Sequence, residues 1–592
     1  MSTAILTGPP VSGSPLEGDL RALGFDVRIA AVPHEVGALL AAVPAGERVA
    51  VVDARFTGHR HALRLALTDP RFDAAAVPGA LGVQPAARPG LDRALARATA
   101  PAHSLPDELA CAIETDGTAV HNPELGTLVA AVPETRVQHE AAAAAVAEVD
   151  EEAVRLRSAV KSRDGFFTTF FISPYSRYIA RWCSDRGLTP NQVTTASLLT
   201  ALVAAGCAAT GQRWGYVTAG VLLLVSFVLD CTDGQLARYS LQYSTLGAWL
   251  DATFDRAKEY AFYAGLALGA ARNGDDVWGL ALGAMILMTC RHVVDFAFNE
   301  ANHDATANTS PTAALSDRLD SVGWTVWARR MIVLPIGERW ALIAVLTATT
   351  TPRITFYALL AGCAFGALYT TAGRVLRSLT RKATRTDRAA QALYDLTDSG
   401  PLAEFPRRLL KARKPAATSL FVAAAAAVAL VACALAFPYG APALIGVALL
   451  YAVAAGQAVA HPLKGALDWL IPPLFRAAEY GTVLVLAAKA EVNGALPAAF
   501  GLVAAVAYHH YDTVYRIRGN AGAPPHWLVR TIGGHEGRVL LTVVLATVLA
   551  RTDFPVALTA LAVFVALVVL AESIRFWVSA GAPAVHDEGE PA

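Results

Sequence analysis

The strongest constraint on the fold is a series of long apolar segments that begins near residue 190 and continues almost to the end of the chain. About 20 apolar residues suffice for a helix to cross the hydrocarbon core of a bilayer. We therefore expect a mainly α-helical, polytopic membrane protein. Twelve spans are predicted, near residues 193–210, 215–232, 250–272, 277–298, 339–350, 354–373, 417–436, 441–460, 474–490, 495–510, 539–550 and 555–574.

The composition narrows the functional class. Hydrophobic residues make up 54% of the chain and charged residues 17%, whereas soluble proteins carry about a quarter charged residues. Lys+Arg and Asp+Glu both number 49, and this balance argues against a nucleic-acid partner. The seven cysteines form no Cys-x-x-Cys pair, so neither a disulfide framework nor a zinc site is expected. No cleaved signal peptide is evident at the N-terminus.

The first 160 residues contain no spanning segment and have a different pattern. Strand-like runs at 4–7 and 48–53 are each followed by Gly or Pro and a helical pattern, which is typical of βα units. The predicted organisation is a small soluble α/β domain over 1–135, one polar linker helix over 136–162, a membrane domain over 163–380, a basic cytoplasmic linker over 381–414, a second membrane domain over 415–580 and a disordered tail over 581–592.

Arginine placement predicts the orientation, because cytoplasmic loops carry the excess of Lys and Arg. Basic clusters precede the first span, separate the fourth from the fifth and follow the sixth, whereas the alternate loops are nearly bare. Both termini and the 300–338 loop are therefore expected in the cytoplasm. Abundant Ala and scarce Lys are typical of a GC-rich bacterial genome, which favours a bacterial inner (plasma) membrane.

Four aspartates in or beside apolar helices carry the chemical signal. Asp230 and Asp233 are three residues apart and share a helix face, and Asp251 and Asp255 form a stripe with Gly247. Buried carboxylates are costly in a membrane and need cations, and the nearby basic residues are too few to make this a set of structural salt bridges. Hard oxygen ligands that converge from two helices suit Mg²⁺ or Mn²⁺.

The spacing D-x-x-D-G-x-x-A-R-x8-G-x-x-x-D-x-x-x-D over 230–255 is similar to the signature of the CDP-alcohol phosphotransferase family and matches it at every fixed position. The resemblance covers about residues 160–380. It implies a six-helix bundle around a cavity open to the cytoplasm, where an acceptor hydroxyl attacks the β-phosphorus of a CDP-linked donor and CMP leaves. It also implies a two-metal site of Mg²⁺ or Mn²⁺ held by Asp230, Asp233, Asp251 and Asp255, with Asp255 as the catalytic base.

The same resemblance implies a CDP site and a subfamily. The residues implied to bind CDP are Asn191, Thr194, Gly234, Ala237, Arg238, Ser244 and Gly247. Segments 164–167 and 177–181 resemble the juxtamembrane helix of the inositol-phosphate-using branch, which includes di-myo-inositol phosphate phosphate synthases and phosphatidylinositol phosphate synthases. The expected donor is a CDP-linked molecule such as CDP-diacylglycerol, and inositol phosphate is a candidate acceptor alcohol. A phosphatidyl or phosphoinositol group would then be transferred in phospholipid or inositol phosphodiester synthesis.

A phosphorylated acceptor needs Arg or Lys near the cavity. The candidates are Arg291, Arg329, Arg330 and Arg374. Positive-inside flanking explains the last three equally well, and an ion pair between Arg291 and Asp295 is the alternative for the first.

The C-terminal half resembles the first membrane domain at an offset of 220 residues. Residues 254–260 read FDRAKEY and residues 474–480 read LFRAAEY, but the four aspartates correspond to Leu450, Val453, Ile471 and Phe475. We therefore predict that 415–580 is a degenerate, non-catalytic six-helix bundle. Because family members commonly form homodimers, either a homodimer or an intramolecular pseudo-dimer is expected. His509, His510 and Asp512 are interpreted as a buried polar cluster rather than a metal site.

The N-terminal domain has no clear catalytic motif. Residues 1–135 stand where some family members carry a cytidylyltransferase, but the segment Gly8–Gly13 has two prolines and no basic residue to cradle a triphosphate. We interpret this domain as a degenerate, nucleotidyltransferase-like domain with a regulatory or partner-binding role, and Asp53 as a turn residue.

The alternative for the whole chain is a non-enzymatic transporter or scaffold with a cation-binding acidic pocket. Ion transport does not require the Gly234, Arg238 and Gly247 framework.

Overall fold

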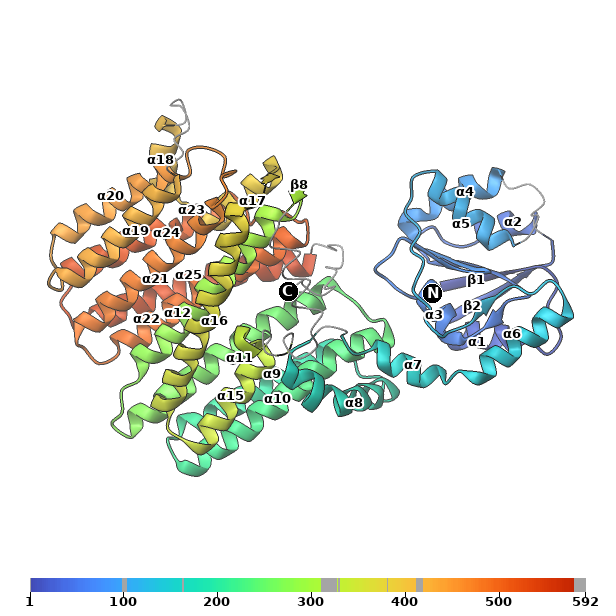
Figure 1. Cartoon of the computed structure of the whole chain (residues 1–592), viewed down its shortest axis with the longest axis horizontal. Helices are drawn as coiled ribbons and strands as arrows, with labels where there is room; N and C mark the ends of the chain where they lie inside the picture. Colours follow the sequence, from blue (N-terminus) through green and yellow to red (C-terminus); the bar gives the residue numbers. More distant parts are fainter. Residues whose placement is uncertain are drawn as a thin grey trace.

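The computed structural model describes residues 2–32, 34–97, 104–161, 164–309, 327, 331–380, 382–410 and 419–579. A small α/β domain is joined by short helices to a large helical body (Figure 1). This arrangement confirms the predicted fold class. The tail predicted over 581–592 lies outside the described residues.

The N-terminal domain is built on a five-stranded sheet in the order β2-β1-β3-β6-β5. The three strands at one side run parallel, and β6 pairs antiparallel with both β3 and β5. Alternate residues point to opposite faces, so Ile5 packs in one hydrophobic cluster while Leu6 packs in the other. The elements are β1 (Ser2–Thr7), α1 (Leu16–Ala22), β2 (Phe25–Ala30), α2 (Glu35–Ala41), β3 (Val49–Asp53), α3 (Arg60–Leu67), β5 (Ala74–Val77), β6 (Ala80–Val83), α4 (Arg88–Arg97) and α5 (Leu105–Thr115).

The linker differs from the single helix that the sequence predicts. It contains two helices, α6 (Arg136–Glu148) and α7 (Glu151–Ser158). Val149 is extended, and the Asp150 side chain accepts a hydrogen bond from the backbone N–H of Ala153, which caps the second helix. A capping aspartate in an alanine-rich stretch therefore starts a new helix instead of continuing the first.

The first membrane unit begins with α8 (Ser173–Asp185), an amphipathic helix that leaves Tyr175, Tyr178 and Trp182 exposed. Such aromatic side chains are enriched at membrane interfaces. The next helix, α9, packs against α10 and α11, while α10 also contacts α8 and α15, and α12 contacts α16. The helices are α9 (Pro190–Ala209), α10 (Arg213–Ser240), α11 (Thr245–Arg272), α12 (Trp278–Asn302), α15 (Ile336–Thr349) and α16 (Pro352–Thr380).

The second membrane unit has the same order of contacts. Helix α19 packs against α20 and α21, while α20 also contacts α18 and α24, and α22 contacts α25. Two of its helices, α17 (Asp387–Thr397) and α18 (Pro401–Leu410), lie in the segment predicted as a linker. The others are α19 (Ser419–Ala436), α20 (Ala443–Ala458), α21 (Ile471–Ala490), α22 (Ala495–Arg518), α23 (His526–Ile532), α24 (Gly534–Val548) and α25 (Phe554–Ser579).

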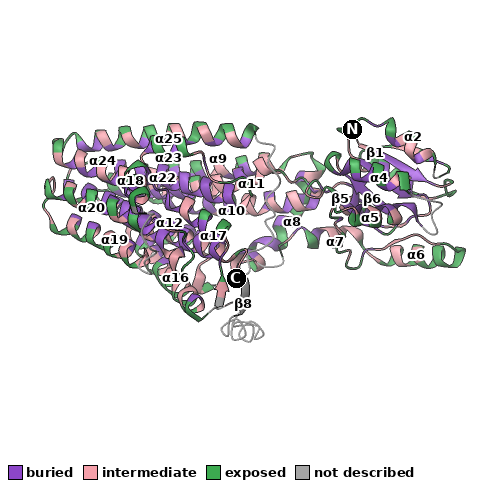
Figure 2. Cartoon of the chain, turned by 90° about the horizontal axis from the view of Figure 1, so that it is seen from above, coloured by how far each residue is buried: buried purple, intermediate pink, exposed green. Residues whose placement is uncertain are grey.

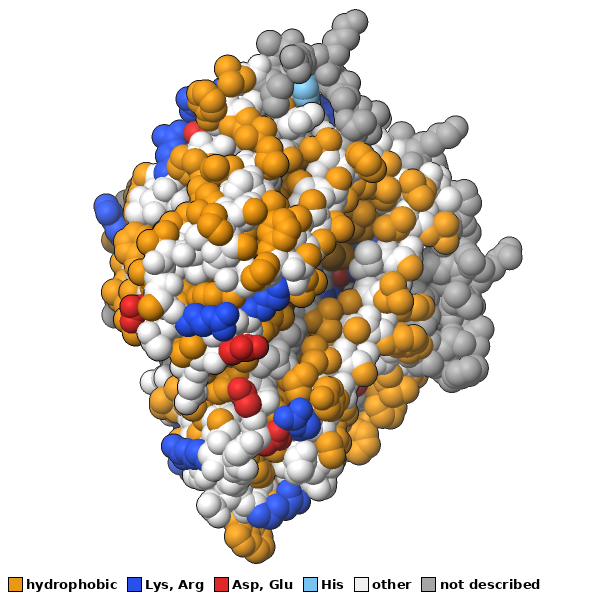
Figure 3. All heavy atoms as spheres, turned by 90° about the vertical axis from the view of Figure 1, so that its left-hand side faces the viewer, with side chains coloured by type: hydrophobic (Ala, Val, Ile, Leu, Met, Phe, Trp, Pro, Cys, Tyr) orange, Lys and Arg blue, Asp and Glu red, His pale blue; other side chains and the backbone are white. Residues whose placement is uncertain are grey.

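Each of the twelve predicted spans coincides with a helix. Among the described residues, seven helices are long and apolar enough to cross a bilayer, and the others are shorter or carry more charge. Hydrophobic side chains cover much of the face shown in Figure 3, and the outward sides of α16, α19 and α25 are exposed in Figure 2. The chain is a multi-pass membrane protein.

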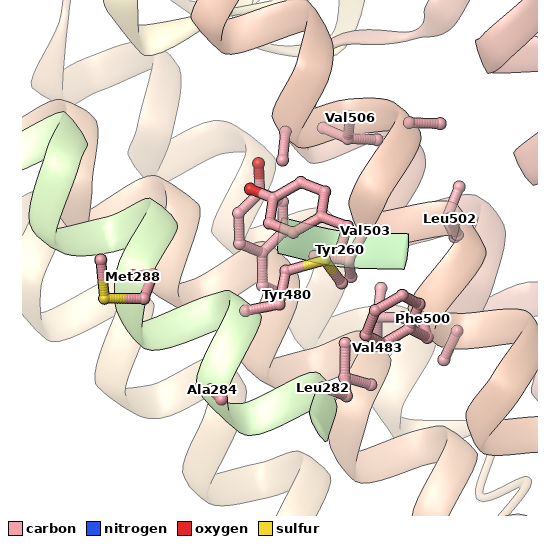
Figure 4. Close-up of a cluster of buried hydrophobic side chains, with 14 of the residues drawn as sticks. Tyr260, Leu282, Ala284, Met288, Tyr480, Val483, Phe500, Leu502, Val503 and Val506 are labelled. Carbon is pink, nitrogen blue, oxygen red and sulfur yellow. The ribbon is translucent and has the colours of Figure 1, made fainter. Parts of the chain in front are cut away.

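The two units share one hydrophobic core. Helix α12 packs against α21 and α22, and α11 packs against α22. Figure 4 shows Tyr260 from the first unit beside Tyr480 and Val503 from the second. The Trp278 ring also meets the Phe500 ring edge-on, with 5.6 Å between their centroids.

Both units bury a matching set of ion pairs. In the first, Glu259 pairs with Arg256 and Arg339, each at 3.0 Å. In the second, Glu479 pairs with Arg476 at 2.7 Å and with Arg538 at 2.5 Å. The arginine comes three residues before the glutamate in both, and the second arginine comes from α15 or α24, which contact α10 and α20 respectively.

Because Arg538 also pairs with Asp398 at 2.7 Å, its loss leaves two buried carboxylates short of a partner. We expect Arg538→Met to destabilise the protein by about 3–5 kcal/mol, since removing one partner of a buried pair strands the others. Arg551→Met is the control, because Arg551 is half exposed and pairs loosely with Glu491. The measurement is the fraction of monodisperse protein left after heating in detergent. Equal heat sensitivity of the two variants would contradict the assignment.

Candidate active site

The four aspartates lie at one end of two consecutive helices. Helix α10 ends where Leu241 adopts a left-handed conformation, with φ 54°, and α11 starts after Ser244, whose hydroxyl accepts a hydrogen bond from the Gly247 N–H at 3.0 Å. Asp230 and Asp233 therefore come shortly before the turn, and Asp251 and Asp255 shortly after it. This tight turn brings the two predicted acidic stripes together.

Three of the four carboxylates converge. Asp230, Asp233 and Asp251 each offer an oxygen, and these oxygens lie within 4.8 Å of one another. Asp233 is only 4% exposed, and its Oδ2 atom has no hydrogen-bond partner among the described residues. A buried carboxylate oxygen without a partner is costly unless a cation satisfies it. The trio therefore fits the hard, oxygen-preferring Mg²⁺ or Mn²⁺.

The fourth aspartate faces a lysine, Lys258, which is not among the site residues predicted from the sequence. Lys258 is fully buried, and its Nζ lies 3.0 Å from Asp255 Oδ1. The same Nζ pairs with the Asp230 carboxylate and donates to Ser197 Oγ at 3.2 Å. The sequence spacing could have predicted this position. Lys258 follows Asp255 by three residues and Asp251 by seven, which places all three on one face of α11.

Most residues predicted to bind CDP gather around the start of α9 and the turn. Thr189 caps α9, and the Thr194 side chain interacts with Asp233. Asn191 lies so close to Gly247 that a Cβ there would be 2.8 Å from Asn191 Oδ1. Ser244 lies on the same side, as the cap of α11.

The remaining CDP-binding predictions lie on α10. A Cβ at Gly234 would lie 3.4 Å from an Arg238 guanidinium nitrogen, so this side chain extends along the helix past Gly234, and Ala237 precedes it. The Arg238 Nε donates to the carbonyl of Ala159 at 2.6 Å. Arg238 is thus held by the end of the linker.

Helix α7 holds the end of α10 at a second residue as well. The Arg155 guanidinium stacks over the Tyr239 ring at 3.5 Å and donates to the Tyr239 carbonyl. The Tyr239 hydroxyl donates to Glu152 at 2.7 Å. The linker from the N-terminal domain therefore contacts the helix that carries Asp230 and Asp233.

The arginines predicted for the acceptor have different surroundings. Arg291 is 6% exposed, and its Nη2 donates to the Val333 carbonyl, while its Nε and Nη1 have no partner within the described part of the chain. Arg374 pairs with Asp295, the residue that the alternative assigned to Arg291. Arg329 and Arg330 lie outside the described residues.

Two other polar sets have structural partners. His509 contacts the Asp398 carboxylate at 3.0 Å, and Asp512 accepts from Trp577 and Ser573, each at 2.7 Å. These contacts agree with a buried polar cluster. Asp53 accepts from the Arg55 backbone N–H at 2.9 Å and pairs with its guanidinium, which agrees with a turn role.

Two segments of the chain match known family models. Residues 187–365 match the family model described as CDP-alcohol phosphatidyltransferase, and residues 387–592 match a family of unknown function, DUF5941. The first membrane unit contains a CDP-alcohol phosphatidyltransferase domain. This match confirms the resemblance drawn from the aspartate signature.

The relatives of this domain include proteins named for inositol phosphates. The chain is 32% identical over 114 residues to the bifunctional IPC transferase and DIPP synthase of Aquifex aeolicus, 31% over 113 residues to the archaetidylinositol phosphate synthase of Pyrococcus horikoshii, and 33% over 110 residues to the phosphatidylinositol phosphate synthase of Streptomyces avermitilis. Each match covers 19% of this chain and, respectively, 26%, 58% and 43% of the relative. The chain thus spans less than two thirds of each relative's length.

The close approach at Gly247 gives a test of the geometry of the CDP-alcohol phosphatidyltransferase domain. In Gly247→Ala, the added methyl would lie 2.8 Å from Asn191 Oδ1 and 2.9 Å from Ser244 Oγ, so one of them must move. We expect the free energy of unfolding to fall by about 1 kcal/mol, because the Ser244 cap is then broken. Gly206→Ala on α9 meets nothing within 4 Å and should not lower stability, because alanine is the better helix former. Thermal unfolding of both variants measures the difference, and an unaffected Gly247→Ala would contradict this geometry.

Proposed function

We propose that the protein is a metal-dependent CDP-alcohol phosphotransferase, which transfers a phosphatidyl or phosphoinositol group from a CDP-linked donor to an acceptor hydroxyl and releases CMP. The observation that carries the proposal is the convergence of Asp230, Asp233 and Asp251, with the Thr194 side chain against Asp233. A transporter or scaffold would need the acidic pocket alone. The family match over 187–365 also favours the transferase.

The roles of the residues follow from their places. Asp230, Asp233 and Asp251 would hold Mg²⁺ or Mn²⁺, which neutralises the diphosphate and orients it for in-line attack. Asp255, one turn beyond Asp251, would accept the proton of the acceptor hydroxyl. Asn191, Thr194, Ser244 and Gly247 would line the CDP site from the start of α9 and the turn, with Gly234, Ala237 and Arg238 on α10.

The acceptor we propose is a phosphorylated inositol. Two guanidinium nitrogens of buried Arg291 have no partner among the described residues, and a phosphate is a natural charged acceptor for them. The names of the relatives agree with this choice. Arg374 is a weaker candidate, because Asp295 already pairs with it. CDP-diacylglycerol is the proposed donor.

We place the protein in a bacterial inner membrane, with the active site and both termini in the cytoplasm. The distribution of arginines in the loops supports this orientation. In the same arrangement, the N-terminal domain and α7 lie on the cytoplasmic side, where α7 contacts Tyr239 at the end of α10. A regulatory or partner-binding role for residues 1–135 stays a prediction.

The direct test is CMP release from CDP-diacylglycerol by purified protein in lipid nanodiscs, with Mg²⁺ or Mn²⁺, with and without inositol phosphate. We expect release that depends on both the metal and the acceptor, and a fall of at least 100-fold, the order of a lost general base, in Asp255→Asn. Asp275→Asn is the control. Asp275 lies in the loop between α11 and α12, at the far end of α11 from the turn, and pairs there with Arg353 of α16. If no donor and acceptor pair gives metal-dependent CMP, or if Asp255→Asn keeps full activity, the proposal fails.

We further propose that residues 415–580 are a degenerate copy of the first unit and act as its built-in partner. The matching helix contacts and the matching pairs around Glu259 and Glu479 support a duplication. The contacts between units are also reciprocal, because α12 packs on α21 while its counterpart α22 packs on α11. An intramolecular pseudo-dimer has this pattern.

If α12 and α22 already cover each other, a second chain has no need to dock there. We therefore expect one chain per particle when the protein is released from native membranes in a polymer nanodisc and its mass is measured by native mass spectrometry. A stable two-chain particle, cross-linked through cysteines placed on α12, would contradict the pseudo-dimer.

A further inference from the structure

The buried ammonium of Lys258 lies between carboxylate oxygens that could otherwise bind a second cation. Its Nζ contacts Asp230 and Asp255 at once, and a third contact goes to Ser197 Oγ at 3.2 Å. The side chain is 0% exposed, so it cannot turn outward to solvent without a rearrangement of α11. The centroid of the Trp340 ring lies 5.5 Å from Nζ.

Two other basic side chains near this site, Arg256 and Arg339, have their own partners. Arg256 pairs with Glu259 and stacks over the Tyr511 ring of the second unit at 5.4 Å. Arg339 pairs with Glu259 as well. Of the cations on α11 near the turn, Lys258 is therefore the one aimed at the aspartates.

The four carboxylates consequently form two overlapping sets. Asp230, Asp233 and Asp251 offer converging oxygens, Asp255 faces the ammonium, and Asp230 takes part in both sets. A second divalent ion between Asp230 and Asp255 would need the oxygens that Lys258 already contacts and would lie beside a buried positive charge. Like charges at such short range in a poorly hydrated site repel strongly.

We propose that this chain binds one divalent cation, at Asp230, Asp233 and Asp251, and that the Lys258 ammonium takes the place of the second. Lys258 is then a positioning residue, which fixes Asp255 towards the cation site and supplies a permanent positive charge. The proposal departs from the two-ion site implied by the aspartate signature. It rests on the proposed function only for its catalytic meaning, because the number of bound ions can be measured without any reaction.

The experiment counts Mn²⁺ bound per chain in nanodiscs and records the electron paramagnetic resonance spectrum of the bound ions. The wild type should bind one ion that Asp233→Asn fails to bind, with the spectrum of an isolated Mn²⁺. Lys258→Met removes the ammonium but keeps an apolar chain of similar length, and it should bind two. Two ions about 4 Å apart, as in known two-metal sites, would give a spin-coupled spectrum.

Lys489→Met is the matched control, because Lys489 on α21 donates to the carbonyl of Phe437, away from the aspartates. It should bind one ion, as the wild type does. A wild-type protein that binds two coupled ions overturns the proposal, and so does a folded Lys258→Met that binds only one. If Lys258→Met is not monodisperse, the wild-type stoichiometry and spectrum still decide. One bound ion with no CMP release from any donor would refute the proposed function and leave this inference standing.

Discussion

The structure depends on how charge is compensated inside a body that faces lipid. Each unit buries a glutamate between two arginines, and in the second unit Asp398 joins the same network through Arg538. In these networks every carboxylate is paired with at least one arginine, so the pairs hold helices together. The acidic site differs, because Asp233 keeps an oxygen without a partner among the described residues. A carboxylate oxygen left in this state is what a divalent cation would bind.

The described part of the second unit supports the site without contributing a carboxylate to it. Trp577 on α25 stacks on Trp249, which lies between Gly247 and Asp251 on α11, with 6.1 Å between ring centroids. Tyr511 on α22 lies against Arg256, next to Asp255 in sequence. Helix α11 is therefore packed on one side by α9 and on the other by the second unit. A helix held from both sides keeps its aspartates in a fixed register, which a metal site requires.

Hydropathy and motif spacing predicted much of this arrangement, for a physical reason. A span must be helical in lipid, so each predicted span corresponds to a helix, and residues three or four apart on α10 and α11 must share a face. What they did not predict depends on single side chains. The break at Asp150 is a local capping bond, and the contact of Lys258 with Asp230 joins two helices. Neither contact has a periodic pattern in the sequence.

The comparison between the units separates two kinds of buried polar residue. The Arg–Glu pairs occur in both, at 256 and 259 and again at 476 and 479, whereas the positions of the four aspartates hold Leu450, Val453, Ile471 and Phe475 in the second. The position of Lys258 holds Ala478. If the lysine served only to hold helices together, it would be expected beside the retained Arg–Glu pair. It is absent together with the aspartates instead, which links its role to theirs and to the ion that we propose they bind.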